Sequence, residues 1–191
     1  MEANCYLAYD EKSKKALIVD PGDEADFIIS KILALQIEPI AQIATHGHFD
    51  HIMAAFELGL AFKIPFLANL NDGVLVKRAS FSASRFTHSP VMPVPKIDKN
   101  FSSGDAISFG KESLIVIETP GHTPGGICLY SKKDKVLFSG DLIFAGGGEG
   151  RSDFSYSEPK LLKASIKKVL SLPKETTVYP GHGQEFLLGK W

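Results

Sequence analysis

The stretch "IATHGHFDHI" at residues 43–52 decides the fold. It follows an alternating apolar run and places His46, His48, Asp50 and His51 within six positions, although the chain has only six histidines. Imidazole and carboxylate side chains are unsuited to an apolar core, but they are good ligands for zinc, iron and manganese. The stretch therefore predicts a strand that ends in a metal-binding loop.

Three further residues of the same kind follow apolar runs elsewhere in the chain. His122 lies in "ETPGHTPGG", Asp141 ends "FSGD", and His182 lies in "YPGHG". Five of the six histidines thus stand just past the ends of predicted strands, and random scatter would not place them there repeatedly. The sixth, His88, is interpreted as an ordinary loop residue. The strand ends are expected to deliver these side chains to one shared site.

The number of candidate ligands predicts two metal ions rather than one. Residues 46 and 48 of an extended segment point the same way, so both can reach one metal. Asp50 and His51 follow where the chain turns into a helix, so they can serve a second metal. Seven ligands exceed the four that a tetrahedral zinc uses, which favours two metals sharing Asp141. A purely structural site is the alternative, although catalytic zinc sites are the ones that keep open positions.

The bulk composition is that of a globular protein. The chain has 191 residues, 44% of them hydrophobic, and a net charge of −1, which argues against a nucleic-acid or membrane-surface partner. No apolar run approaches the ~18–20 residues of a membrane-spanning helix, and "MEANCYLAYD" does not resemble a signal peptide. We therefore expect a cytoplasmic protein. Cys5 and Cys128 lie in apolar runs and are expected to be buried free thiols in strands.

Strands and helices are mixed along the chain. Apolar runs that end at Gly, Pro, Asp or Asn predict strands at residues 4–10, 15–20, 40–45, 64–69, 105–109, 113–119, 126–131, 135–141 and 176–181. Apolar residues at helical spacing predict helices at residues 23–36, 50–62, 71–86 and 158–172. The Pro-rich stretch 88–104 is expected to be a loop. This density predicts two packed sheets, or one sheet with helices outside it.

Two of the helices have a predicted apolar face. In 23–36 it consists of Phe27, Ile28, Ile32, Leu33 and Leu35. In 158–172 it consists of Leu161, Leu162, Ile166, Val169 and Leu170, and Pro173 is expected to stop the helix.

The motifs "THGHFDH", "PGHTPGG", "SGD" and "YPGHG" resemble the metal-binding motifs of the metallo-β-lactamase-fold superfamily, in the same order over almost the whole chain. Within it the chain is most similar to glyoxalase II-like (hydroxyacylglutathione hydrolase-like) hydrolases of the short bacterial type. The phrase "GRSDFS" (150–155) resembles a segment of that subgroup. The resemblance implies an α/β (α+β) fold: a four-layer αβ/βα sandwich of two mixed sheets with outer helices and metals at one edge, between the sheets.

The resemblance also assigns the ligands of two divalent metal ions, expected to be zinc with iron or manganese left open. One ion is held by His46, His48 and His122, the other by Asp50, His51 and His182, with Asp141 bridging. The implied reaction is hydrolysis of S-D-lactoylglutathione or a similar small thioester by metal-activated water. Asp50 would orient that water or accept its proton while also serving as a ligand.

Two residues are predicted to contact the substrate. Arg151 is the candidate for binding a substrate carboxylate, with a salt bridge to Asp153 or Glu149 as the alternative. Tyr156 is expected to line the same pocket, with simple packing as its alternative. The larger glyoxalase II enzymes continue into a helical domain that helps to bind glutathione. Residues 1–191 are expected to form a single domain without it, and the oligomeric state stays open.

Two other activities remain open at this stage. Persulfide dioxygenases share the fold and a similar "GR-x-DF" phrase, but they use one iron held by two histidines and an aspartate. A lactonase or β-lactamase of the same superfamily is the other alternative. One group of zinc β-lactamases has a cysteine in place of the aspartate found here at 141, which counts against that group.

Overall fold

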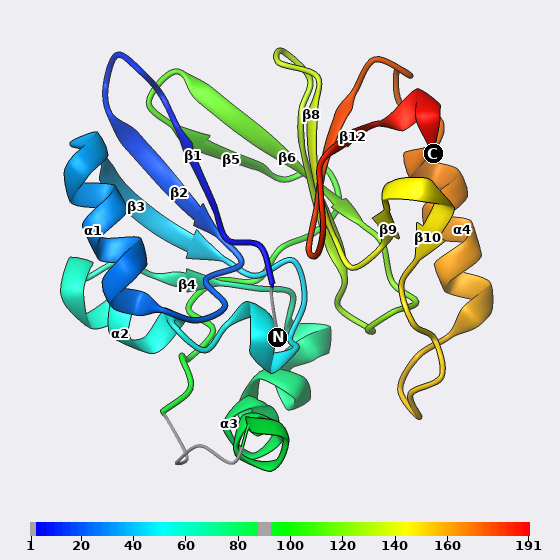
Figure 1. Cartoon of the computed structure of the whole chain (residues 1–191), viewed down its shortest axis with the longest axis horizontal. Helices are drawn as coiled ribbons and strands as arrows, with labels where there is room; N and C mark the ends of the chain where they lie inside the picture. Colours follow the sequence, from blue (N-terminus) through cyan, green and yellow to red (C-terminus); the bar gives the residue numbers. More distant parts are fainter. Residues whose placement is uncertain (1–2, 88–92) are drawn as a thin grey trace.

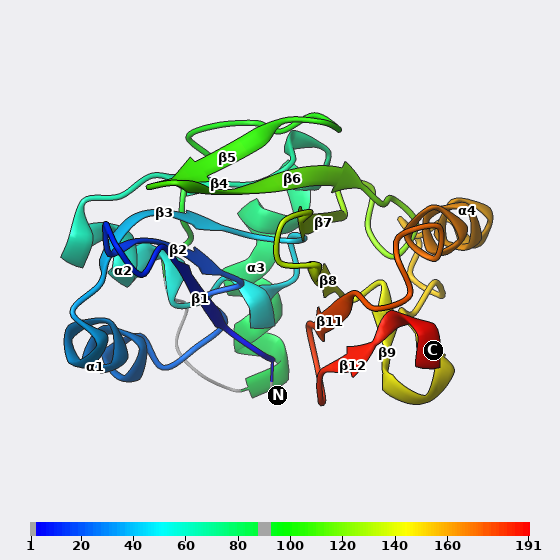
Figure 2. The same cartoon turned by 90° about the horizontal axis from the view of Figure 1, so that it is seen from above.

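The computed structural model describes residues 3–87 and 93–191, and two sheets face each other in it (Figures 1 and 2). The first sheet has four strands in the order β1-β2-β3-β4. Its strands are β1 (Tyr6–Tyr9), β2 (Lys15–Val19), β3 (Glu38–Ile43) and β4 (Phe66–Leu67). β1 runs antiparallel to β2, whereas β2, β3 and β4 are parallel. The sheet is therefore mixed, as predicted.

The second sheet has six strands in the order β12-β11-β8-β7-β6-β5. Its strands are β5 (Ala106–Phe109), β6 (Glu112–Glu118), β7 (Ile127–Ser131), β8 (Val136–Gly140), β11 (Thr177–Pro180) and β12 (Phe186–Leu187). Only β8 and β11 are parallel neighbours, so this sheet is mixed too. All nine predicted strands are confirmed. The short strands β9 (Ile143–Phe144), β10 (Gly148–Glu149) and β12 were not predicted.

Helices cover the outer faces of both sheets (Figures 1 and 2). The first sheet carries α1 (Ala25–Leu35) and α2 (Ala55–Phe62), and the second carries α4 (Pro159–Val169). The helix α3 (Gly73–Thr87) lies at one end of the sandwich. Short 3-10 turns lie at Phe49–His51, Leu70–Asp72, Ala145–Gly147 and Leu188–Lys190. The predicted αβ/βα sandwich is confirmed.

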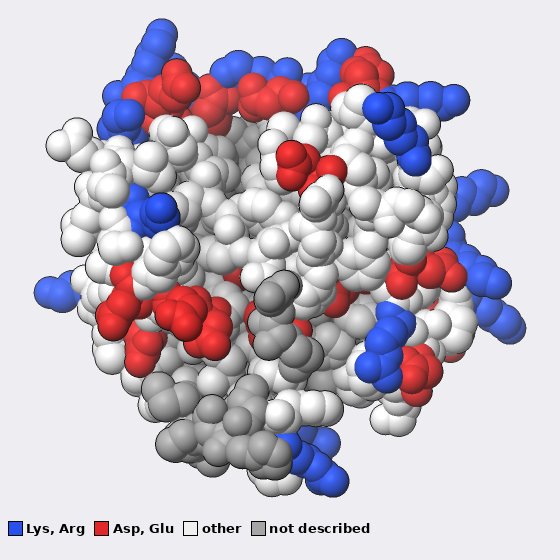
Figure 3. All heavy atoms as spheres, in the orientation of Figure 1, with Lys and Arg blue, Asp and Glu red and all other residues white. Residues whose placement is uncertain are grey.

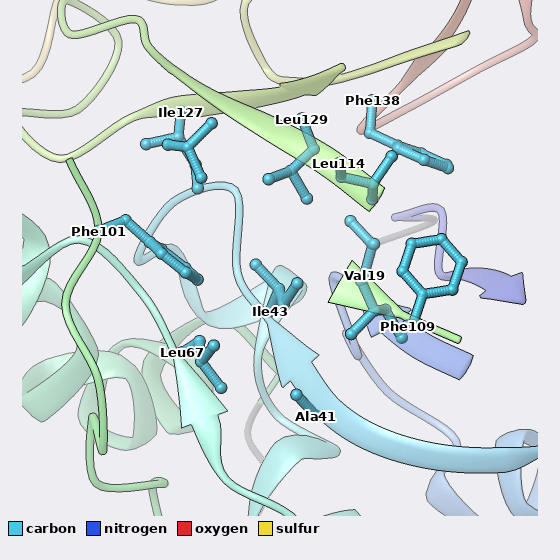
Figure 4. Packing of buried hydrophobic residues seen from close by; sticks show 12 residues of the cluster. Val19, Ala41, Ile43, Leu67, Phe101, Phe109, Leu114, Ile127, Leu129 and Phe138 are labelled. Atoms are coloured by element: carbon cyan, nitrogen blue, oxygen red, sulfur yellow. The ribbon is translucent and has the colours of Figure 1, made fainter. Parts of the chain in front are cut away.

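The main core lies between the two sheets. Figure 4 shows Val19 and Ile43 of the first sheet facing Leu114 and Leu129 of the second, and Ala41 belongs to the same cluster. These side chains are buried, and removing such apolar surface from water is the main driving force for joining the sheets. A large part of the fold's stability therefore comes from the same interface that brings the strand ends together.

The strand β2 shows why its apolar residues follow one another without interruption instead of alternating with polar ones. Leu17 and Val19 belong to the core between the sheets, whereas Ala16 and Ile18 pack with α1. Successive side chains of a strand point to opposite faces, and both faces of this strand are covered. All four residues are fully buried.

The predicted apolar faces of two helices are wrong in part. In α1, Ile28 and Ile32 are buried, but Phe27, Leu33 and Leu35 are 58%, 66% and 42% exposed. The buried stripe is narrower than the predicted face and runs through residues 25, 28 and 32, one side of a 3.6-residue period. In α4, Leu161 and Leu170 are likewise exposed, while the remaining predicted positions are buried.

Two other expectations are corrected, and a third falls partly outside the described residues. The helix predicted over 50–62 begins only at Ala55, because a 3-10 turn takes up Phe49–His51. Cys128 is a buried free thiol in β7, but Cys5 is only half-buried and lies just before β1. His88 and the first part of the predicted loop lie outside the described residues. No helix within the described ranges combines the length and the apolar character needed to cross a bilayer.

Candidate metal centre

Strand ends from both sheets meet at one edge of the sandwich. His46 and His48 follow β3 of the first sheet, whereas Asp141 and His182 follow β8 and β11 of the second. The structure brings together all seven predicted residues, in two groups. One group is His46, His48, His122 and Asp141, and the other is Asp50, His51 and His182. Their role as ligands stays a prediction, but their convergence is a property of the fold.

In the first group, three ring nitrogens surround a common point. The Nδ1 atom of His48 lies 3.1 Å from Nε2 of His46 and 3.1 Å from Nε2 of His122. Asp141 Oδ2 lies 4.0 Å from Nε2 of His46 and 3.7 Å from Nε2 of His122. The facing atoms of the whole group lie within 4.8 Å of one another, close enough for one metal ion to reach all of them.

Asp141 also faces the second group. Its Oδ1 atom lies 3.5 Å from Nε2 of His51, and its Oδ2 atom lies 3.6 Å from Nε2 of His182. Asp50 Oδ2 lies 3.5 Å from that His182 nitrogen. A carboxylate within 4.0 Å of nitrogens from both groups occupies the position that a bridging ligand would need.

Two observations show that these residues fit divalent cations. His51 Nε2 and Asp141 Oδ1 are buried, and neither has a hydrogen-bond partner among the described residues. Burial, reinforced by neighbouring histidines, lowers the pKa of His46 well below its usual range and that of His48 to about 3. Neutral imidazoles offer lone pairs to a cation, and a cation that displaced the proton of His51 would also satisfy the two unpaired atoms.

A buried aspartate orients His51. Asp20 is 1% exposed, and its Oδ2 atom lies 3.1 Å from Nδ1 of His51. It also accepts hydrogen bonds from the backbone N–H and the hydroxyl of Thr45. Burial by itself lowers the pKa of His51, but the charge and hydrogen bond of Asp20 outweigh it and raise that pKa to about 9. The contact at Nδ1 directs Nε2 toward Asp141, a common outer-shell arrangement at metal sites.

A second buried aspartate joins two of the loops. Asp72 is fully buried just before α3, and its Oδ2 atom accepts hydrogen bonds of 2.8 Å from Gly47 N and from Thr123 Oγ1. Its Oδ1 atom accepts a 2.6 Å hydrogen bond from Gly125 N. Gly47 lies between two candidate ligands, and Thr123 directly follows another. Asp72 therefore fixes the loop after β3 against the loop after β6.

The sequence reasoning missed both of these aspartates. Asp20 ends an apolar strand, as Asp141 does, so the same signal was present and could have found it. Asp72 stands before a helix, where an acidic residue is favoured for local reasons alone. Its contacts reach residues 25 to 53 positions away, and nothing in the local pattern reveals them.

The structure places the two predicted substrate residues beside the first group. The side chain of Arg151 makes two hydrogen bonds, of 2.9 and 2.8 Å, to Asp153, which is one of the alternatives weighed for it. Its backbone carbonyl lies 2.7 Å from Nδ1 of His122 and can accept a hydrogen bond from it. The hydroxyl of Tyr156 lies 2.7 Å from Nε2 of His48, a contact that was not predicted. Substrate binding by either residue stays a prediction.

One glycine is required by close packing at the centre. A Cβ atom on Gly181 would overlap Asp141 Oδ1 and lie 2.8 Å from Cε1 of His51. Only a residue without a side chain leaves the Asp141 carboxylate and the His51 ring in place, which explains the glycine before His182 in "YPGHG".

A cleft of about 1200 Å³ opens onto the candidate metal centre. His48, Asp50 and Asp141 lie in its lining, together with Arg151, Tyr156 and one side of α3. The hydrogen bond to His182 and the charge of His51 outweigh burial and lower the pKa of Asp50 to about 2, so it is ionised at neutral pH. The centre is therefore accessible to a small molecule, with a carboxylate available beside it.

Comparison with known proteins gives the family. A model described as "Metallo-beta-lactamase superfamily" matches residues 1–182. "Hydroxyacylglutathione hydrolase GloC" of Haemophilus influenzae is 33% identical over 192 residues, which cover 99% of this chain and 89% of that protein.

Two solved structures have the same fold. One is described as "BLEG-1 B3 metallo-beta-lactamase", with a TM-score of 0.89, 35% identity and coverage of 98% of this chain and 90% of that one. The other is "TTHA1623 in a di-iron-bound form", with a TM-score of 0.88, 35% identity and coverage of 98% and 91%. Both alignments span the strands and loops that carry the seven converging residues.

Proposed function

The chain belongs to the metallo-beta-lactamase superfamily, and from that premise we propose that this metallo-hydrolase cleaves small thioesters of the S-D-lactoylglutathione type. The observation that carries the proposal is the pair of ligand groups facing one carboxylate, Asp141, at the base of an open cleft. The similarity to a hydroxyacylglutathione hydrolase over nearly its whole length supports the choice of thioesters.

The residues present would hold two divalent cations. His46, His48 and His122 would hold the first, Asp50, His51 and His182 would hold the second, and Asp141 would lie between them. When bound, such ions lower the pKa of water and polarise a carbonyl group. A relative described as di-iron supports two ions, and it leaves iron open beside zinc and manganese.

The protein's own groups would orient the reactants. Asp50 is ionised, borders the cleft and can orient a water molecule or accept its proton. The contact of Tyr156 with Nε2 of His48 and of the Arg151 carbonyl with Nδ1 of His122 leaves the opposite ring nitrogens facing the centre. A thiolate leaves readily without a strong general acid, so the proposal needs none.

The decisive experiment is elemental analysis of the purified protein followed by three assays. The proposal expects two divalent ions per chain and hydrolysis of a small thioester. One iron per chain with oxygen uptake on glutathione persulfide would instead establish the dioxygenase alternative. Cleavage of a β-lactam without thioester hydrolysis would favour the activity in the description of one solved relative.

A further inference from the structure

One side of α3 forms a wall of the cleft. The residues of this side recur every three or four positions, as one face of a helix does, and they are Val74, Leu75, Arg78, Ala79, Ser82 and Phe86. Most of them are apolar, and Arg78 stands among them. We call this surface the α3 wall.

The α3 wall begins beside the candidate metal centre and extends along the helix. A Cβ atom on Gly47 would lie 2.9 Å from Cβ of Leu75, so the helix starts against the loop between His46 and His48. Near its other end, Phe86 stacks on Phe49 with ring centroids 5.7 Å apart. Leu75 and Phe86 are eleven positions apart, which corresponds to about 16 Å along the helix axis. The wall is therefore long enough to contact a substrate well beyond its reacting carbonyl.

Arg78 is the cation of the α3 wall. Two arginines line it, and Asp153 already holds the guanidinium of Arg151 through two hydrogen bonds. Within residues 3–87 and 93–191 Arg78 has neither an ion pair nor a hydrogen-bonded side-chain partner. Three acidic residues stand in the described lining: Asp50 and Asp141, which belong to the candidate metal centre, and Glu149, which forms no ion pair with Arg78. A guanidinium left without a carboxylate of its own can bind one from a ligand.

We propose that Arg78 binds a carboxylate on the thiol half of the thioester substrate, whose apolar stem lies along the α3 wall. This inference rests on the proposed function, because the reacting carbonyl must then lie at the metal centre. A small acyl group fills little of a 1200 Å³ cleft, so the longer thiol half extends along α3. One guanidinium matches one carboxylate in two parallel hydrogen bonds. The preferred substrates are thus thioesters of acidic thiols.

The test compares two lactoyl thioesters that differ by one charge: that of N-acetylcysteine, with a free carboxylate, and that of N-acetylcysteine amide, which is neutral. Arg78→Ala should raise the KM for the acidic thioester about 10-fold, or about 1.4 kcal/mol, with the neutral one unchanged. Arg78→Lys should retain part of the preference. The matched control is Arg85→Ala, an exposed arginine of α3 outside the cleft lining, which should change neither KM.

A binding measurement separates this inference from the proposed hydrolysis. Metal-loaded protein is titrated with S-methyl-N-acetylcysteine and with its amide. Both compounds are thioethers, so neither can be hydrolysed and neither can bind a metal through a thiolate. The wild type should prefer the acid about 10-fold, and Arg78→Ala should abolish that preference. Equal binding of acid and amide by the wild type, or an unchanged preference in the variant, would overturn the role of Arg78. Failure to hydrolyse either thioester would overturn the proposed function instead.

Discussion

At the scale of single residues, Asp141 connects the two groups of candidate ligands. Changing outer-shell partners of metal ligands typically costs 10–100-fold, so Asp141→Ala is expected to lower activity by at least about 100-fold and to reduce the metal content. Atomic absorption and steady-state kinetics on the same preparation measure both. Asp26→Ala, at an exposed position of α1, is the control and should keep both. Full metal content in Asp141→Ala would contradict the bridging position.

Asp72 is expected to act through the loops it joins. Asp72→Asn places an amide N–H₂ among three donors, so we expect a loss of about 1–3 kcal/mol in the free energy of unfolding and weaker metal binding. Urea denaturation and metal titration measure the two effects.

Asp10 provides the matched control for that experiment. Its carboxylate is also buried and accepts hydrogen bonds from Ser13 Oγ and from the backbone of Lys111, but it lies in a hairpin away from the centre. Asp10→Asn should therefore lower stability without changing metal affinity. If both variants bind metal as the wild type does, Asp72 supports the fold only.

The candidate ligands could be read from the sequence and Asp20 could have been, whereas the role of Asp72 could not. His46, His48 and Asp141 stand at strand ends, where polar side chains interrupt an apolar pattern visibly. The role of Asp72 depends on contacts with residues far away along the chain. The pairing of Arg151 with Asp153 was foreseen only as one of its alternatives, because sequence does not show which neighbour an exposed guanidinium selects.

At the scale of elements, α4 packs directly on the loop that carries His122. Gly121 has a φ of +139°, and a Cβ atom there would overlap the backbone of Leu162. The backbone N–H of Glu158 also donates to the Gly121 carbonyl over 2.8 Å. The start of α4 thus holds this loop in place.

Gly121→Ala is therefore expected to destabilise the protein by about 3 kcal/mol or more, since backbone strain and overpacking each contribute 1–3 kcal/mol. It should also weaken metal binding through His122. Gly104→Ala is the matched control, because Gly104 has a φ of +93° but open space around it. Urea unfolding of both variants separates packing from backbone strain. Equal losses would mean that the contact with α4 is unimportant.

The elements differ in how well local sequence predicts them. β2 and β7 are long apolar runs with clear ends, and they were found. β9 and β10 have two residues each and exist through pairing with one another, so no periodic signal precedes them. Phe27 in α1 is exposed because the buried stripe of the helix runs through residues 25, 28 and 32, and a helical period alone does not show how wide that stripe is.

At the scale of the whole molecule, metal binding and stability are expected to be linked. Seven candidate ligands from both sheets converge, and a cation held only by the folded state at 1,000 times its dissociation constant adds about 4 kcal/mol. Chelation should then lower the Tm by about 10 °C, and added zinc, manganese or iron should restore it. Calorimetry with and without chelator measures this shift. A Tm insensitive to chelator in protein that carries metal would contradict the linkage.

The fold and the family were predictable because their signals are distributed over the whole chain, from the loop after β3 to the loop after β11. The side chain of α3 that we propose to select the substrate was not. Figure 3 shows charged side chains of both signs interspersed around a broad uncharged area, without one dominant field on that face. The α3 wall becomes visible only in the structure, because Arg78 is an ordinary polar position in the sequence, and Arg151, which the sequence did single out, is paired with Asp153.

Each of the two ligand groups takes members from both sheets. The four-stranded sheet supplies His46 and His48 to one group and Asp50 and His51 to the other, and the six-stranded sheet completes each. Neither half of the chain therefore contains all members of a candidate ligand group. If the halves were produced as separate fragments, tight cation uptake would require their reassociation. The ion would then act as a reporter of fragment complementation, independent of any catalytic assay.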